Sequence, residues 1–203
     1  MARSGCLGRL FWLPAALFGG TRPRAAIPQQ GLDAAERDAL MSARRAADGI
    51  TKRLLAAGRD VAPQVLDQVG GSAQALGEAV DQMGLQLAET RRWLARHAPD
   101  QLHRQLTELE LTDGPGTAAR LTTMKQLRAQ AKRAAEVRAE LPTMSATLRA
   151  TAAQLGGLEA SLRLDTLRTD AADAARRAAA ERAEAERSLA AWQATVDELR
   201  ALS

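Results

Sequence analysis

Apolar residues recur at alternating steps of three and four along residues 66 to 94, and this spacing constrains the fold more than any other feature of the chain. Thr90 is the one polar member of the series Leu66, Val69, Ala73, Leu76, Val80, Met83, Leu87, Thr90 and Leu94. Side chains at this spacing form one stripe along an α-helix, which packs against a partner helix as in a coiled coil. The segment is therefore predicted to be a long amphipathic helix.

A shorter stripe of the same spacing precedes it and predicts a second helix. Asp33 and Glu36 have the spacing of a capping box, in which each side chain binds the backbone amide of the other residue, so a helix is expected to begin there. Gly58 suits the end of that helix and Pro63 suits the first turn of the next one. Because the connection is short, the two helices are predicted to form an antiparallel hairpin.

Three glycines, Gly70, Gly77 and Gly84, recur every seven residues beside the longer stripe. Glycine costs roughly 1 kcal/mol relative to alanine inside a helix. The repeat therefore indicates close approach of a neighbouring helix, a flexible helix, or a coincidence in an Ala- and Gly-rich chain. The neighbour would be the first helix of the hairpin or another copy. The helix-packing candidates are thus Leu66, Val69, Gly70, Leu76, Gly77, Val80, Met83, Gly84, Leu87 and Leu94.

Further breaks divide the rest of the chain. Pro99 ends the second long helix, and the turn-forming residues 113–116 lie before Thr117, which is placed to cap the next helix. Pro142 is expected to kink or restart that helix, and the glycines at 156–157 to weaken it. A long last helix is predicted to start near residue 165 or 169 and to run to about residue 200.

Composition supports an all-α fold. The chain has no Tyr and only two Phe, both in its first 18 residues, whereas strong helix formers such as Ala, Leu, Arg, Glu and Gln dominate the remainder. The predicted fold is an elongated antiparallel helical hairpin or coiled-coil-like bundle of about five or six helices with a long C-terminal helix. The predicted organisation is a leader (1–30), a hairpin with a short helix (31–112), a linker (113–116) and a second helical region (117–203).

The leader differs chemically from everything after it. Its four arginines account for the whole net charge of +4, because it has no acidic residue before position 33 and the remaining basic and acidic side chains are equal in number. The balanced body lacks the basic stripe of a nucleic-acid-binding protein. The apolar run 10–20 is too short for the roughly 20 residues of a spanning helix. Candidate membrane contacts are Arg9, Phe11, Trp12, Phe18, Arg22 and Arg24.

Two interpretations of the leader remain open. It is either an uncleaved interfacial anchor or a targeting segment that is removed, for export or, in a eukaryote, for an organelle. Cys6 is either acylated or an unmodified thiol.

No arrangement of residues indicates an enzyme. Asp100 and His103 give the closest approach to a metal-binding spacing, but it occurs once, and both His97 and His103 are expected to be ordinary surface residues. Cys6 has no positioned base, and no Ser-His-Asp set or phosphate-binding glycine loop is present. No cofactor or metal is expected.

The expected function is that of a non-enzymatic coiled-coil scaffold, bound peripherally to a membrane through its leader and associating with itself or with another helical protein. Anionic lipid is a further candidate partner, and nucleic acid is not one. The alternative is an exported, periplasmic or organellar helical protein that binds lipid or a partner after leader removal. The expected architecture is similar to that of phage-shock and ESCRT-III-like membrane-remodelling proteins, an analogy of arrangement in which no motif is shared.

Overall fold

The computed structural model describes residue 26 and residues 30–57, 62–111, 117–162 and 171–201. Almost all of these residues are helical and none of them is in a strand, which confirms the all-α prediction for this part of the chain. The described helices are α1 (Ala34–Ala57), α2 (Pro63–Arg96), α3 (Pro99–Leu111), α4 (Ala118–Ser161) and α6 (Ala171–Ala201).

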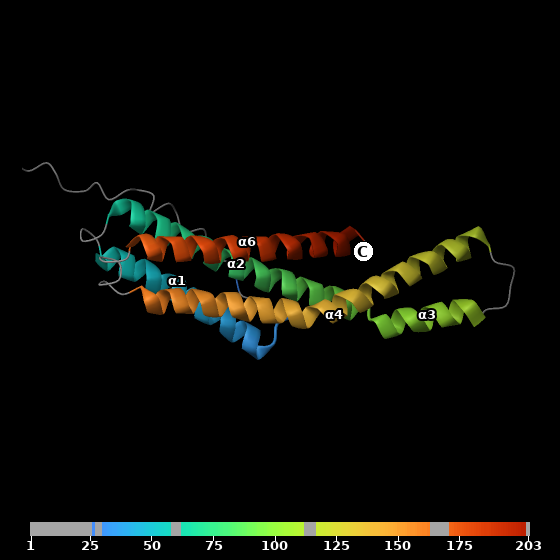
Figure 1. Cartoon of the computed structure of the whole chain (residues 1–203). Helices are drawn as coiled ribbons and strands as arrows, with labels where there is room; N and C mark the ends of the chain where they lie inside the picture. The colour runs from blue at the N-terminus through green and yellow to red at the C-terminus, as the bar shows by residue number, and fades with distance from the viewer. Residues whose placement is uncertain (1–25, 27–29, 58–61, 112–116, 163–170, 202–203) are drawn as a thin grey trace, which may run out of the picture.

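Four long helices form an elongated bundle, and α3 lies outside it (Figure 1). α1 and α4 run in one direction and α2 and α6 in the other, with the most extensive packing between α2 and α6 and between α1 and α4. α3 packs on the first half of α4 and extends with it beyond the bundle. We call α3 together with residues 118–138 of α4 the arm. The bundle therefore has four helices within the described residues, so the prediction of five or six was too high.

The unbroken course of α4 explains part of that difference. Pro142 lies inside α4 and does not end it, and the helix also continues through the glycines at 156–157. Proline lacks the N–H that would bond to the carbonyl four residues earlier, and this loss bends a helix without requiring a new one. The ribbon of α4 changes direction between its yellow arm half and its orange bundle half (Figure 1). The expected kink is present, and the expected restart is absent.

Four of the predicted helix starts are confirmed, whereas the predicted start of the last helix near residue 165 or 169 lies outside the described residues. The backbone N–H of Glu36 donates to Asp33 Oδ1 and that of Asp33 donates to Glu36 Oε2, each at 2.8 Å, which is the reciprocal pattern of a capping box. Pro63 and Pro99 are the first residues of α2 and α3. The hydroxyl of Thr117 accepts from the amide three residues later at 3.3 Å.

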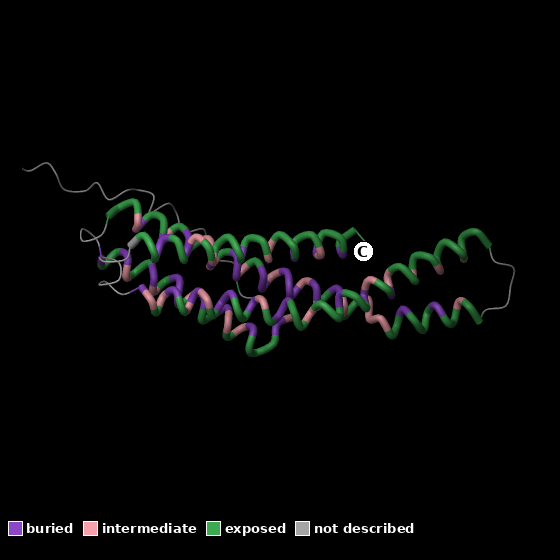
Figure 2. The backbone as a smooth tube through the Cα atoms, viewed as in Figure 1, coloured by how far each residue is buried: buried purple, intermediate pink, exposed green. Residues whose placement is uncertain are grey.

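Two apolar clusters hold the helices together. The larger one joins α1, α2, the bundle half of α4 and α6, and the smaller one lies at the base of the arm around Trp93. Figure 2 shows the buried residues on the inward faces of the bundle helices and exposed residues outside. Many core positions are Ala, which permits close helix approach, while fully buried Ile50, Leu76 and Leu155 contribute roughly 1.5–3 kcal/mol each.

Candidate interaction surfaces

The predicted packing stripe of α2 lies inside the chain's own bundle. Seven of its ten residues are buried, namely Leu66, Val69, Leu76, Val80, Met83, Gly84 and Leu87, and Gly70, Gly77 and Leu94 are half-buried. The neighbours of α2 are α1, α4 and α6. This stripe is therefore covered within one chain and is not exposed for contact with a second copy.

The glycine repeat faces α1 at two of its three positions. A Cβ atom on Gly84 would lie 2.8 Å from Cδ1 of Leu40, closer than real Cβ atoms approach. A Cβ atom on Gly77 would lie 3.5 Å from the Cβ of Ala47, which is an ordinary contact. A side chain at residue 84 would therefore have to displace the buried Leu40 side chain, whereas the backbone at residue 77 has room for alanine.

A buried ion pair that the sequence did not reveal fastens the start of α1 to α2. The carboxylate of Glu36 is 0% exposed and accepts two hydrogen bonds from Arg91, with Nη1–Oε2 at 2.5 Å and Nη2–Oε1 at 2.7 Å. Nη1 of Arg91 also donates to the carbonyl of Gly31 at 3.2 Å. The two partners are 55 positions apart, so no local spacing predicts their contact.

Weaker ion pairs connect the other neighbouring helices. They include Arg44–Asp81 at 2.9 Å, Arg53–Glu159 at 3.2 Å, Arg133–Glu198 at 2.6 Å, Arg200–Glu89 at 2.9 Å and Arg128–Glu110 at 2.7 Å. The pairs whose two partners are both exposed, such as Arg128–Glu110, typically contribute about 0–1 kcal/mol, whereas both partners of Arg44–Asp81 are half-buried. They fix which helix faces lie together more than they stabilise the fold.

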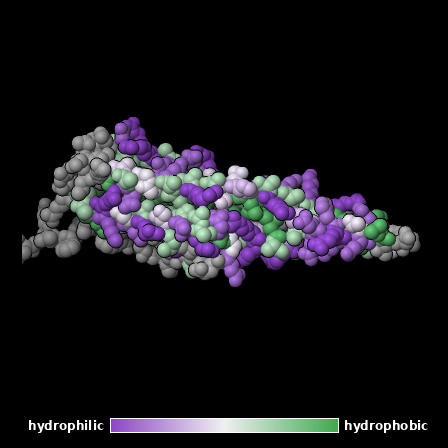
Figure 3. Space-filling view, turned by 90° about the horizontal axis from the view of Figure 1, so that it is seen from below, coloured by the Kyte–Doolittle hydropathy of each residue, from purple (hydrophilic) through white to green (hydrophobic). Residues whose placement is uncertain are grey.

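Burial of apolar side chains decreases along the arm towards its tip. At the base Leu102 and Leu106 are buried, whereas Met124 is only half-buried further out. Beside the loop, Leu111 is 75% and Leu121 is 55% exposed. Figure 3 shows hydrophobic atoms at this narrow end of the molecule. The other bundle helices pack against the arm only at its base. The tip is formed by α3 and α4 alone, and its leucines are exposed.

The residues that came closest to a metal motif do not form a site. Asp100 and His103 are both exposed, and Asp100 lies 3.8 Å from Arg138. His97 is half-buried and stacks on Trp93, with ring centroids 4.5 Å apart, instead of lying free on the surface as predicted. Within the described ranges there is no group of three or more His, Cys, Asp or Glu residues that could hold a metal ion.

The leader candidates Arg9, Phe11, Trp12, Phe18, Arg22 and Arg24 all lie outside the described residues. Among the helices that the structure does describe, none is long and apolar enough to cross a membrane.

Comparison of the chain with protein-family models, with curated proteins and with solved structures finds no match.

Proposed function

We propose that the chain is a non-enzymatic helical scaffold that is held at a membrane surface by residues 1–28 and joins a second copy through the tip of the arm. The observation that carries this proposal is the exposure of Leu111 and Leu121 at the end of a two-helix projection. An apolar surface at the far end of an elongated body, away from its own core, is suited to contact another molecule.

The side chains around the tip favour a second copy as the partner. Glu108 and Glu110 on α3 flank one exposed leucine, and Arg120 and Lys125 on α4 flank the other. Glu110 pairs with Arg128 within the same arm, and a two-fold axis at the tip would bring the exposed leucines of two copies together, so that the same patch serves both. Acidic and basic side chains are equal in number among the four flanking residues, so the tip offers no net electrostatic attraction to an anionic lipid surface.

The leader supplies the membrane part of the proposal. Its arginines have no acidic counterpart and its aromatic residues suit the depth of the lipid headgroups, so attraction to anionic lipid and burial of Phe and Trp act together. In this arrangement the leader binds the membrane, and the arm tip joins copies of the scaffold.

Sedimentation velocity of the full chain over a range of concentrations tests the arm contact. The wild-type chain is expected to form a reversible dimer, and Leu121→Glu is expected to weaken it by about tenfold or more, because a charge enters the centre of an apolar contact. Leu55→Glu on α1 is the matched control, since Leu55 is 47% exposed against 55% for Leu121. A wild-type chain that stays monomeric, or equal weakening by both substitutions, would refute the arm contact.

A further inference from the structure

The two halves of α6 are held in the bundle by side chains of different size. In the first half, residues 172–187, the buried apolar residues are all alanines, namely Ala174, Ala175, Ala178 and Ala185. In the second half, residues 188–201, the buried residues are Trp192, Val196 and Leu199. Because the favourable free energy of burial grows with the apolar area removed from water, the second half is held more firmly than the first.

Hydrogen bonds divide α6 in the same way. In the second half, three side chains bond to α2 or α4, in the pairs Gln193–Gln86, Glu198–Arg133 and Arg200–Glu89. In the first half, Arg176 pairs with Asp173 and Arg182 pairs with Glu186, both within α6 itself. Among the described residues, no side chain of 172–187 has a hydrogen bond or ion pair to another helix. Polar contacts therefore fasten only the second half to its neighbours.

A carboxylate lies on the inward stripe of the first half. Glu181 follows Ala178 by three positions and precedes Ala185 by four, which is the spacing of one helix face. Its Oε2 atom is buried and has no hydrogen-bond partner among the described residues. A buried acceptor of this kind has lost its hydrogen bonds to water without gaining others, so it opposes the packing of α6 at this level.

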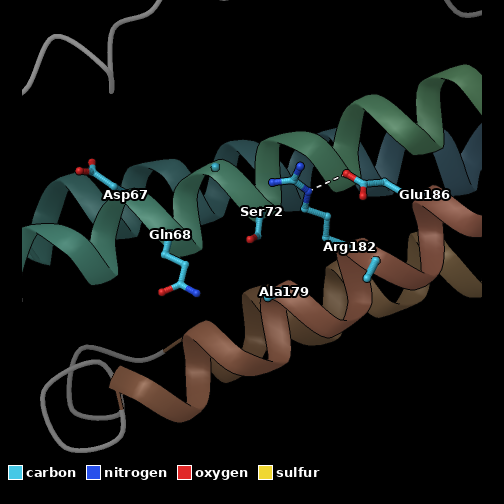
Figure 4. A pocket seen from close by; sticks show the side chains of 8 residues that line it. Asp67, Gln68, Ser72, Ala179, Arg182 and Glu186 are labelled. Carbon is cyan, nitrogen blue, oxygen red and sulfur yellow. Dashed lines mark hydrogen bonds and ion pairs between the residues drawn. The ribbon is translucent and has the colours of Figure 1, made fainter.

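The packing between α2 and the first half of α6 is also incomplete. An open groove of about 370 Å³ lies between the two helices and is lined by Gln68 and Ser72 on α2 and by Ala179 and Arg182 on α6 (Figure 4). On the α2 side, a Cβ atom built on Gly71 would meet nothing within 4 Å. Side chains beside such a space lack the dispersion contacts that a closely packed neighbour would supply.

We propose that residues 172–187 of α6 are a lid that detaches from the bundle while residues 188–201 remain bound, and that Glu181 keeps this lid loosely held. α6 packs mainly on α2 and only slightly on α4. The lid covers the end of the bundle at which α2 begins and α4 ends, away from the arm (Figure 1). Opening uncovers apolar faces at that end without unfolding the remainder, as in the local opening of weakly packed elements. The proposal does not depend on the arm contact or on the leader.

Hydrogen exchange of the unmodified full chain, followed by mass spectrometry, tests the lid directly. Amides of residues 174–185 exchange when the first half detaches, whereas those of 189–199 need the second half to open as well. After correction for intrinsic exchange rates, we expect exchange in the first range to be at least tenfold faster than in the second. Equal protection of the two ranges overturns the proposal.

Thiol labelling of two single-cysteine variants provides a second readout, which reports exposure of the inward face. Ala178→Cys and Val196→Cys, each combined with Cys6→Ser, place a thiol in each half of α6 at a position that is 1% exposed. A buried thiol reacts only from an open form, so its labelling rate follows the population of that form. We expect at least tenfold faster labelling at residue 178, with wild-type circular dichroism in both variants. Equal rates, or faster labelling at residue 196, overturn the proposal.

A matched pair of substitutions tests the role of the carboxylate. Glu181→Leu removes the unpaired acceptor and adds apolar area to the inward face, so it is expected to slow exchange of amides 174–185 by about tenfold or more. Glu184→Leu changes an exposed position of the same half and is expected to leave this exchange within about twofold of wild type. Glu181→Gln removes the charge at nearly constant volume and is expected to slow the exchange by a smaller factor. Unchanged exchange in Glu181→Leu, or equal slowing by both leucine variants, overturns the proposal.

Discussion

Replacement of either partner in the Glu36–Arg91 ion pair is expected to destabilise the bundle, with a larger effect when the arginine is removed. Glu36 is 0% exposed and Arg91 is 27% exposed, so only the arginine can turn towards solvent once its partner is gone. Arg91→Met leaves a buried carboxylate with a single remaining hydrogen bond, from the Asp33 amide, and should cost about 3–5 kcal/mol. Glu36→Leu leaves a guanidinium that water can reach and should cost about 1–3 kcal/mol.

The double variant distinguishes the free energy of the Glu36–Arg91 ion pair from the cost of leaving one buried charge without its partner. Well-packed apolar residues often replace a buried ion pair without loss, so Glu36→Leu combined with Arg91→Met should be markedly more stable than the sum of the single effects predicts. Urea unfolding followed by far-ultraviolet circular dichroism measures all four proteins. Arg128→Met removes an exposed pair, with exposed fractions of 61% and 47%, and should cost about 0–1 kcal/mol. Equal single effects, or strictly additive ones, would refute this reasoning.

Three further outcomes are expected. Gly84→Ala should destabilise the chain by about 1–3 kcal/mol because its methyl group overlaps Leu40, whereas Gly77→Ala should stabilise it by up to about 1 kcal/mol. Thermal unfolding compares the two variants. Equal melting temperatures would contradict the packing described between α2 and α1. Deletion of residues 1–28 should abolish co-sedimentation with anionic vesicles and leave helicity intact, and undiminished sedimentation would place any membrane contact elsewhere. Burial raises the pKa of Glu181, with Arg177 opposing this effect and Glu184 adding to it, so the folded state binds the proton more tightly than the unfolded state. Ionised Glu181 therefore weakens the fold at neutral pH, and the penalty disappears as the pH falls through the raised pKa to below the ordinary value of a glutamate. Glu181→Gln should raise the melting temperature at neutral pH by an amount that shrinks on acidification, and a difference that does not depend on pH would contradict it.

Local signals predicted the helices well, because each rests on neighbours in the chain. The capping box at Asp33, the prolines that open α2 and α3, and the Thr117 cap all act within four residues. The glycine repeat indicated a close helix contact but did not identify the neighbouring helix, because contact with α1 and contact with a second copy would both favour glycine at this spacing.

Tertiary features could not be predicted, because they depend on contacts between residues that are far apart in the chain. Pro142 weakens a helix locally, but packing against α1, α2 and α3 keeps α4 continuous on both sides of it. The packing of α6 on α2 depends on the register of two helices whose contacting residues are more than a hundred positions apart. No spacing within either helix specifies that register.

The pairing of helices across the bundle has a consequence for synthesis of the chain. Arg53 on α1 meets Glu159 on α4 106 positions later, and Glu89 on α2 meets Arg200 on α6 111 positions later. A ribosome that adds 5–20 residues per second needs roughly 5–20 s to cover such an interval. Until then the apolar stripes of α1 and α2 have only each other to cover them. The nascent hairpin is therefore a stage at which apolar faces of α1 and α2 that α4 and α6 later cover are still open, and slower translation lengthens that stage.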